Sequence, residues 1–301
     1  MIRMINTPSY LTLTDSGLSI TDSSIKFVRL RQPFFRGRLE FAECEEIELP
    51  EGVIQSGFIQ DEGKLTSILK DISSRHSLQF VNITLPEERA YLFSANIDKV
   101  PEDSLRDAVA FIIEENAPVT LANSIFDFNV MGEGSDSTLR VTVSVISMKV
   151  LDFYLQVLDH VGLIPASFDL ESQAIARAII PKGNKSVELA IDLGKSKYGF
   201  YIIENGIVQF TTTLSHDNSF RSELEKIFGY WEAHSSGRKI EQAFICGDRA
   251  YEKELVEELK GLCPVPITLA NPWANVWERG GIPSSCEPLD LVSAIGAAIP
   301  H

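Results

Sequence analysis

The chain has 301 residues, of which 44% are hydrophobic, which is enough apolar content for two domains or one large one. Its 27 Lys and Arg residues face 42 Asp and Glu residues, giving a formal charge of −15. This balance disfavours nucleic acid as a partner, because phosphate backbones are bound through an excess of Lys and Arg. The local basic stretch 29–38 is expected to be a solvated loop.

Cysteine and histidine spacing disfavours disulfides and zinc. The four cysteines form no Cys-x-x-Cys pair, and the five histidines lie far apart. With no signal peptide at the start of the sequence, the cysteines are expected to be reduced thiols of a soluble, cytoplasmic protein. No apolar run approaches the roughly 20 residues that span a bilayer, so membrane contact is expected only through a partner.

The first half of the chain predicts a tail at 1–16, a strand–turn–strand unit at 17–30 and an amphipathic helix at 64–75. Residues 79–165 predict a separate α+β unit with its own sheet, inserted into this half. Its helix at 102–116 is expected to bury one stripe of side chains. The stripe consists of Leu105, Ala108, Phe111 and Ile112. The remaining elements expected here are strands at 40–49, 79–85, 90–97, 124–130, 138–147 and 163–170, and helices at 149–161 and 171–180.

The second half begins after the polar linker 182–186 and opens on another strand–turn–strand unit. Asn205-Gly206 lies between alternating apolar runs and predicts a tight hairpin, because both turn positions need positive φ. The elements expected afterwards are helices at 218–228, 250–262 and 290–298, and strands at 240–246 and 265–269.

Two turns are candidates for binding phosphate. Asp192 and Gly194 lie at the turn of the second strand–turn–strand unit, and Asp22 lies at the turn of the first. Backbone N–H groups at such turns can bind an anion, and a neighbouring Asp can hold a cation through water. The alternative is an ordinary meander with a solvated Lys-Ser-Lys turn. The similarity of the two strand–turn–strand units indicates an internal duplication. Two similar halves that close on a phosphate between them are the arrangement of actin-like proteins.

The order of these pieces resembles the PilM-type proteins of type IV pilus assembly, which are actin-like and related to FtsA. The resemblance covers about residues 17–299. It depends on the two hairpins, on FDLESQAIAR (168–177) and LVSAIGAA (291–298) as connecting helices, and on FICGDRAYEKEL (244–255) as the adenosine segment. It implies an α/β, ribonuclease H-like fold with two duplicated lobes, 1–181 and 182–301. The last helix is expected to pack back toward the first lobe.

The resemblance also implies a cytoplasmic scaffold at the inner membrane. Such proteins bind ATP or ADP between the lobes and a short N-terminal peptide of the membrane protein PilN in a groove beside the inserted unit. No catalytic or metal-binding residue is assigned. The residues carried over to the nucleotide site are Asp22, Ser23, Ser24, Lys26, Glu171, Asp192, Gly194, Lys195, Ser196, Gly247 and Asp248.

The nucleotide site departs from the family pattern. Ser19 stands where the family has a metal-serving Asp, and Thr21 where it has Gly. Tyr198 and Lys195 replace smaller residues in the second hairpin, and Asp248 replaces a Gly. These changes predict either weak nucleotide binding with little dependence on Mg²⁺ or a vestigial site in which Lys195 supplies the charge of a lost metal.

Three functions follow. The first is an adaptor of pilus or type II-like secretion machinery, which tolerates a decayed nucleotide site. The second is an active ATPase or small-molecule kinase in the inter-lobe cleft, which needs a metal and a positioned base. The third is a filament former like FtsA, which is ranked last because no membrane-binding helix follows residue 298. Homo-oligomer formation is left open.

The adaptor hypothesis predicts how a partner docks. An open strand edge at 79–85 or 124–130 could accept an extended peptide, because edge strands expose unpaired N–H and C=O groups. The charge of −15 favours a peptide that carries Lys or Arg. The alternative is that loops cap these edges and the charge serves solubility. The duplicated plan further predicts that Lys26 and Asp192 face each other across one cleft.

Overall fold

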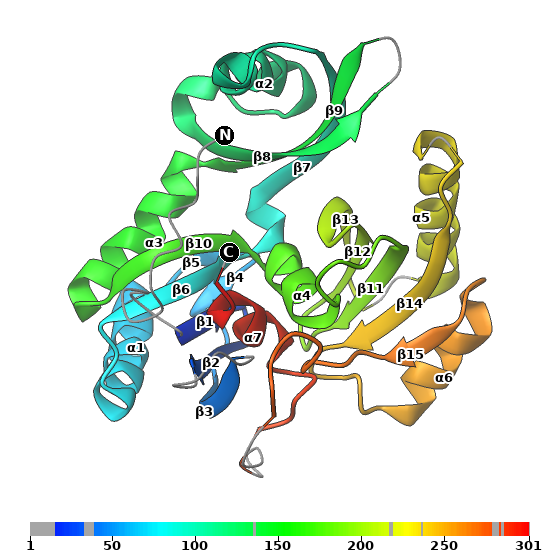
Figure 1. Cartoon of the computed structure of the whole chain (residues 1–301). Coiled ribbons are helices and arrows are strands. Elements are labelled where there is room, and N and C mark those ends of the chain that lie inside the picture. The colour runs from blue at the N-terminus through cyan, green and yellow to red at the C-terminus, as the bar shows by residue number, and fades with distance from the viewer. Residues whose placement is uncertain are drawn as a thin grey trace.

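The computed structural model describes residues 16–32, 39–134, 137–216, 219–235, 237–278, 283 and 286–300 (Figure 1). The tail predicted at 1–16 lies outside these residues except for Ser16, and so does most of the basic stretch 29–38. Among the described residues, no helix is long and apolar enough to cross a membrane.

Two five-stranded sheets share one strand order, which is direct structural evidence for the duplication. The first sheet runs β10-β6-β1-β2-β3 and the second runs β15-β14-β11-β12-β13. In both, the first three strands of the half form an antiparallel meander and the last two lie parallel to its first strand. The first sheet consists of β1 (Ser16–Ile20), β2 (Ser24–Arg31), β3 (Glu40–Glu48), β6 (Phe80–Leu85) and β10 (Ile164–Leu170). The second consists of β11 (Val187–Leu193), β12 (Tyr198–Glu204), β13 (Ile207–Leu214), β14 (Ile240–Cys246) and β15 (Ile267–Leu269).

Helices cover these sheets and also connect them. In the first half, α1 (Glu62–His76) and α3 (Met148–Val161) pack on each other and share one apolar core with the first sheet. In the second half, α5 (Phe220–His234) and α6 (Lys253–Leu262) contribute to the core of the second sheet. Two further helices, α4 (Glu171–Ile179) and α7 (Val292–Ala298), pack against each other. Besides these, a short β4–β5 ladder joins Ile54–Gln55 to Phe58–Ile59, and 3₁₀ turns lie at Glu87–Arg89, Glu102–Ser104 and Leu121–Asn123.

The contact of α7 with α4 and β1 depends on two glycines. A Cβ on Gly296 would lie 1.7 Å from the backbone oxygen of Ala174 in α4, and one on Gly17 would lie 2.1 Å from the backbone oxygen of Ala294. Only a residue without a side chain allows this approach. The small residues at the end of the sequence therefore bring α7 against the first sheet.

The inserted unit is smaller than the sequence predicted. Its sheet has only three strands, in the order β7-β9-β8, and α2 (Leu105–Asn116) covers one face. These strands are β7 (Ala90–Asp98), β8 (Ser124–Glu133) and β9 (Thr138–Ser147), and Figure 1 shows the unit at the top of the molecule.

The prediction that residues 79–165 form a sheet of their own is wrong at both ends. β6 lies between β10 and β1 in the first sheet, and α3 packs in the core of that sheet. For the same reason β6 is not the open edge that the sequence predicted. Alternating hydrophobicity identifies a strand but does not identify its neighbours, which here come from parallel pairing over long sequence distances. The separate unit spans 90–147.

The stripe predicted on α2 is wrong at one position. Val109 and Ile113 are buried, whereas Phe111 is 78% exposed. Successive residues are about 100° apart around a helix, so Phe111, two positions from both buried residues, lies on the opposite side. Leu105, Ala108 and Ile112 pack at the border of the core as expected.

Local turn signals are confirmed. Asn205 and Gly206 have φ of 55° and 77° and join β12 to β13. Gly162 ends α3 in the left-handed conformation with φ of 80°. Both positions therefore have the backbone geometry that their residue types predict.

Candidate functional sites: a closed cleft and an open groove

The two strand–turn–strand units meet at one cleft, as the sequence predicted for Lys26 and Asp192. Both residues line it, with Lys26 on β2 itself and Asp192 near the end of β11. Of the residues proposed for a nucleotide, those that line this cleft are Ser23, Lys26, Glu171, Asp192, Gly194, Lys195, Ser196 and Asp248.

Three of the proposed residues do not line the cleft. The Asp22 carboxylate accepts hydrogen bonds from the backbone N–H groups of Ser56 (2.6 Å) and Gly57 (2.8 Å), so it orders a neighbouring loop. Ser24 is buried within the first sheet. Gly247, with φ of 95°, lies so near Asp192 that an added Cβ would be 2.3 Å from its carboxylate oxygen.

The cleft itself is nearly filled and has a cavity volume of only about 30 Å³. Ion pairs cross it. Lys26 Nζ lies 2.6 Å from Asp248 Oδ1, and Lys195 Nζ lies 2.8 Å from Glu48 Oε1. Lys197, in the turn between β11 and β12, pairs with Glu88. Lys197, Glu48 and Glu88 are not among the site residues predicted from the sequence, where Lys197 figures only in the alternative of a solvated Lys-Ser-Lys turn.

Three carboxyl groups in the cleft are shifted toward their neutral form. Burial raises the pKa of Glu171 to about 8, that of Asp192 to about 6 and that of Asp290 to about 7. In each case the loss of hydration is the largest cause, and neighbouring acids add to it. The cleft is therefore rich in acidic groups that resist ionisation.

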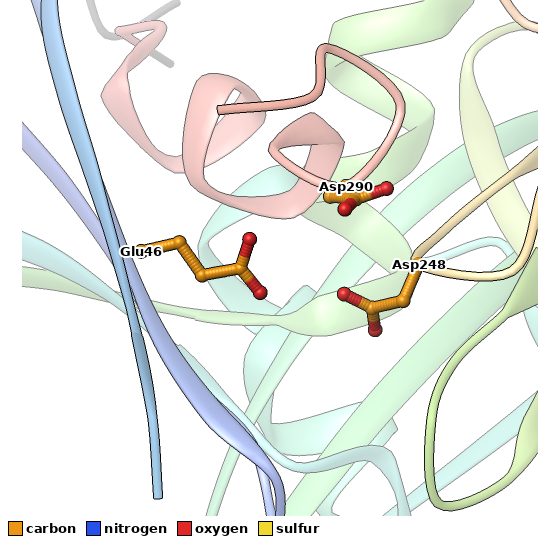
Figure 2. A group of neighbouring side chains, drawn as sticks. All are labelled: Glu46, Asp248 and Asp290. Carbon is orange, nitrogen blue, oxygen red and sulfur yellow. The ribbon is translucent and has the colours of Figure 1, made fainter. Parts of the chain in front are cut away.

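A second acidic group lies beside Lys26. Oxygens of Glu46 on β3, of Asp248 after β14 and of Asp290 before α7 lie within 4.8 Å of one another (Figure 2). Glu46 Oε1 and Asp290 Oδ1 are buried and accept no hydrogen bond from the described residues. Carboxylate oxygens in such a group are ligands that hard divalent cations prefer. Here the nearest cation is the ammonium of Lys26, bound to Asp248.

The hydroxyl of Ser19, where the family has an acid, serves a structural purpose. It accepts hydrogen bonds from Thr84 (3.0 Å) and Ser293 (2.9 Å), and all three residues are buried. These bonds join β1, β6 and α7. The position that serves a metal in the resembled family is thus occupied here by a neutral network within the fold.

A much larger cavity lies beside the inserted unit. It has a volume of about 580 Å³ and separates β8 and β9 from β10, α4 and the turn between β12 and β13. Its apolar lining includes Ile125, Ile146, Leu151 and Phe168. Its polar lining includes Asp127, Asn129, Gln173 and Lys182. We call this cavity the docking groove.

One wall of the docking groove is an edge strand. β8 pairs with β9 on one side and has no strand on the other within the described part of the chain. Ile125, Phe126, Asp127 and Asn129 line the groove, and Phe126 and Phe128 also pack toward the α2 core. Of the two edges that the sequence proposed, the one at 124–130 is therefore the edge that the structure contains.

Comparison with family models found no match, and comparison with curated proteins found none. Solved structures do match. A chain of the PilM–PilN type IV pilus biogenesis complex is 16% identical, with 94% of this chain and 97% of that chain covered and a TM-score of 0.76. The cytoplasmic domain of EpsL, an inner-membrane component of the Vibrio cholerae type II secretion system, is 11% identical, with 95% of each chain covered and a TM-score of 0.54.

A third match is the ethanolamine utilization protein EutJ from Carboxydothermus hydrogenoformans. It is 12% identical, with 94% of this chain and 88% of that chain covered and a TM-score of 0.51. At these identities the likeness concerns the fold alone. Two equivalent sheets, an inserted unit and a nearly complete overlap with the PilM–PilN structure show that this chain has the actin-like fold expected from its sequence.

Proposed function

We propose that the protein is an actin-like scaffold of type IV pilus assembly, or of a related secretion system, that works in the cytoplasm beside the inner membrane. In this proposal it binds the cytoplasmic N-terminal segment of a PilN-like membrane protein in the docking groove. The likeness to a chain from a PilM–PilN complex supports the choice of partner. The observation that carries the proposal is the contrast between an open groove of about 580 Å³ and a closed cleft of about 30 Å³.

The docking groove suits an extended peptide. The free edge of β8 offers backbone N–H and C=O groups for strand addition, and Ile125 and Phe168 offer apolar surface for alternate side chains. Asp127 lines the same wall and favours a Lys or Arg in the peptide. The overall charge of −15 would then speed association at low salt, and added salt would weaken the effect.

The inter-lobe cleft supports a scaffold over an enzyme. Sites for small molecules and cofactors usually have volumes of about 300–1,000 Å³, roughly ten times the cavity here or more. Phosphoryl transfer also needs a metal that bridges the phosphates, whereas Ser19 offers only a hydrogen-bonded hydroxyl where the family has an acid. We therefore propose a degenerate site that binds ATP or ADP weakly, with little dependence on Mg²⁺.

Peptide binding tests the proposal. Fluorescence anisotropy would follow a labelled peptide with the N-terminal sequence of the PilN-like protein from the same cell. Ile125→Lys places a charge in the groove and is expected to weaken binding at least tenfold, which corresponds to about 1.4 kcal/mol. Phe111→Lys, on the exposed side of α2, is the matched control and should bind within twofold of the wild type. Equal binding by both variants would overturn the groove assignment.

A second candidate function, an active ATPase or small-molecule kinase, is tested separately. Calorimetry would measure ATP and ADP binding with and without Mg²⁺. Tight binding that requires Mg²⁺, together with steady hydrolysis, would favour the enzyme over the scaffold.

A further inference from the structure

We propose that Lys26, Lys195 and Lys197 are tethered cations that hold the inter-lobe cleft closed without nucleotide or metal. The inference deepens the proposed function and rests on its inactive cleft. It concerns how this chain fixes the arrangement of its two lobes.

Lys26 provides the central bridge. It belongs to β2 of the first sheet, while its partner Asp248 follows β14 of the second sheet, 222 residues away in the chain. Their side chains are only 5% and 7% exposed. A buried ammonium without a partner is costly, so this pair fixes both groups in place.

The surroundings of Lys26 match those of a bound cation. Glu46 and Asp290 add two carboxylates beside Asp248, and Figure 2 shows the three side chains converging from separate parts of the chain. Burial alone would lower the pKa of Lys26, but Asp248, Glu46 and Asp192 more than offset it, so the net pKa is raised. The ammonium therefore stays charged where the fold gathers ligands suited to a divalent cation.

The other two lysines bridge in the opposite direction. Both lie in the turn between β11 and β12 of the second sheet. Lys197 pairs with Glu88, in the turn after β6, and both side chains are largely covered. Lys195 reaches Glu48 on β3 at 2.8 Å and lies 3.8 Å from Glu46. Each lobe thus contributes at least one lysine that forms an ion pair with an acidic residue of the other lobe.

These bridges oppose nucleotide binding in two ways. A nucleotide would have to separate the covered Lys26–Asp248 and Lys197–Glu88 pairs to gain room, since the cavity holds only about 30 Å³. Its phosphates would also compete with carboxylates that are already in place, and a tethered partner acts at a high effective concentration. In this proposal the lysines hold the two lobes together from within the chain, without nucleotide or metal.

Hydrogen exchange of the two turns, residues 21–24 and 194–197, measures lobe closure directly. In the wild-type protein, millimolar Mg²⁺ or Mg²⁺-ATP should leave this exchange unchanged. In Lys26→Met/Lys197→Met, exchange in both turns should rise at least tenfold, while β13 keeps its protection as an internal reference. Unchanged turn exchange in the double variant would overturn the proposal, and so would wild-type exchange that slows tenfold with Mg²⁺-ATP.

Metal-dependent melting of a variant that lacks the Lys26 ammonium gives a second readout. Lys26→Met leaves Glu46, Asp248 and Asp290 without their ammonium, so its melting temperature should rise with added Mg²⁺ or Ca²⁺. Lys260→Met, on α6, whose side chain is 43% exposed and pairs with Glu257, is the control and should show no such rise. A Lys26→Met protein that melts as the wild type does at every metal concentration would contradict the bridge.

If variants at Lys26 do not fold, Lys197→Met alone still tests whether the lysines hold the cleft closed. Unchanged hydrogen exchange of the two turns in that variant would count against the proposal. The peptide assay distinguishes the two proposals. Unchanged turn exchange in the lysine variants together with intact peptide binding refutes only the inference, whereas the expected rise in turn exchange without any peptide binding refutes only the proposed partner.

Discussion

Glu171→Gln should make the protein more stable at neutral pH, because the carboxyl that it replaces is buried at the first position of α4. Burial raises the pKa of Glu171 from an ordinary 4.5 to about 8; Lys197 opposes this shift, and Asp192 and Glu88 add to it. The folded state binds the Glu171 proton more tightly than the unfolded state does. The stabilisation that comes from this proton is therefore complete below pH 4.5. It is lost progressively as the pH rises toward 8.

The size of the effect follows from the two pKa values. Between pH 4.5 and pH 7, each pH unit costs about 1.4 kcal/mol, so the loss reaches about 3 kcal/mol at pH 7. Gln keeps the shape of the neutral acid and cannot ionise. The variant should therefore match the wild type within about 1 kcal/mol at pH 5 and exceed it by up to about 3 kcal/mol at pH 7.

Urea unfolding at pH 5 and pH 7 measures this difference. Asp290, whose pKa is also raised, remains in both proteins and cancels in the comparison, whereas Asp192 contributes to the pKa shift of Glu171 itself. Glu232→Gln, at an exposed position of α5, is the control and should behave the same at both pH values. A Glu171→Gln protein that is less stable at pH 7 would show that Glu171 is ionised there and needed as the counter-ion of Lys197.

Three further predictions concern the fold around the sites. Gly296→Ala should lower the melting temperature and loosen the contact between α4 and α7, because the added Cβ would overlap the backbone of Ala174. Gly229→Ala in α5, where nothing lies within 4 Å of the added Cβ, should instead raise the free energy of unfolding by up to about 1 kcal/mol. Phe111→Ser should leave the free energy of unfolding nearly unchanged, whereas Val109→Ala should cost about 2 kcal/mol in chemical denaturation. Asp22→Ala should speed hydrogen exchange of the Ser56 and Gly57 amides without changing peptide binding, and unchanged exchange would contradict its role in ordering that loop.

Local chemistry explains which parts of the fold the sequence predicts well. The Asn205-Gly206 hairpin and the Gly162 cap depend on a few adjacent residues, and both are present. The position of β6 depends on parallel pairing with β1 and β10, more than 60 residues away in the chain on either side. No local pattern encodes that pairing, which is why the bounds predicted for the inserted unit, 79–165, are too wide.

In the cleft, too, some features can be predicted from the sequence and others depend on the fold. The resemblance brought together Lys26, Asp192 and Asp248 as members of one site, and they do lie together. It could not reveal that Lys26 is bonded to Asp248 or that Lys197 is bonded to Glu88. These pairs join residues of opposite lobes, and their partners are set by how the two sheets close. A charged residue in sequence has no identifiable partner until the fold supplies one.

The duplicated sheets explain why one molecule contains both a closed cleft and an open groove. Between its last two strands, the second half places one helix, α6, whereas the first half places the whole unit 90–147 followed by α3. That insertion brings β8 over β10 and α4, so the docking groove exists only on its side. The cleft forms instead where the two meanders meet, and there lysines face acids across the lobes. Because different segments build the two sites, a substitution in the cleft need not alter the docking groove, and the two sites can change independently.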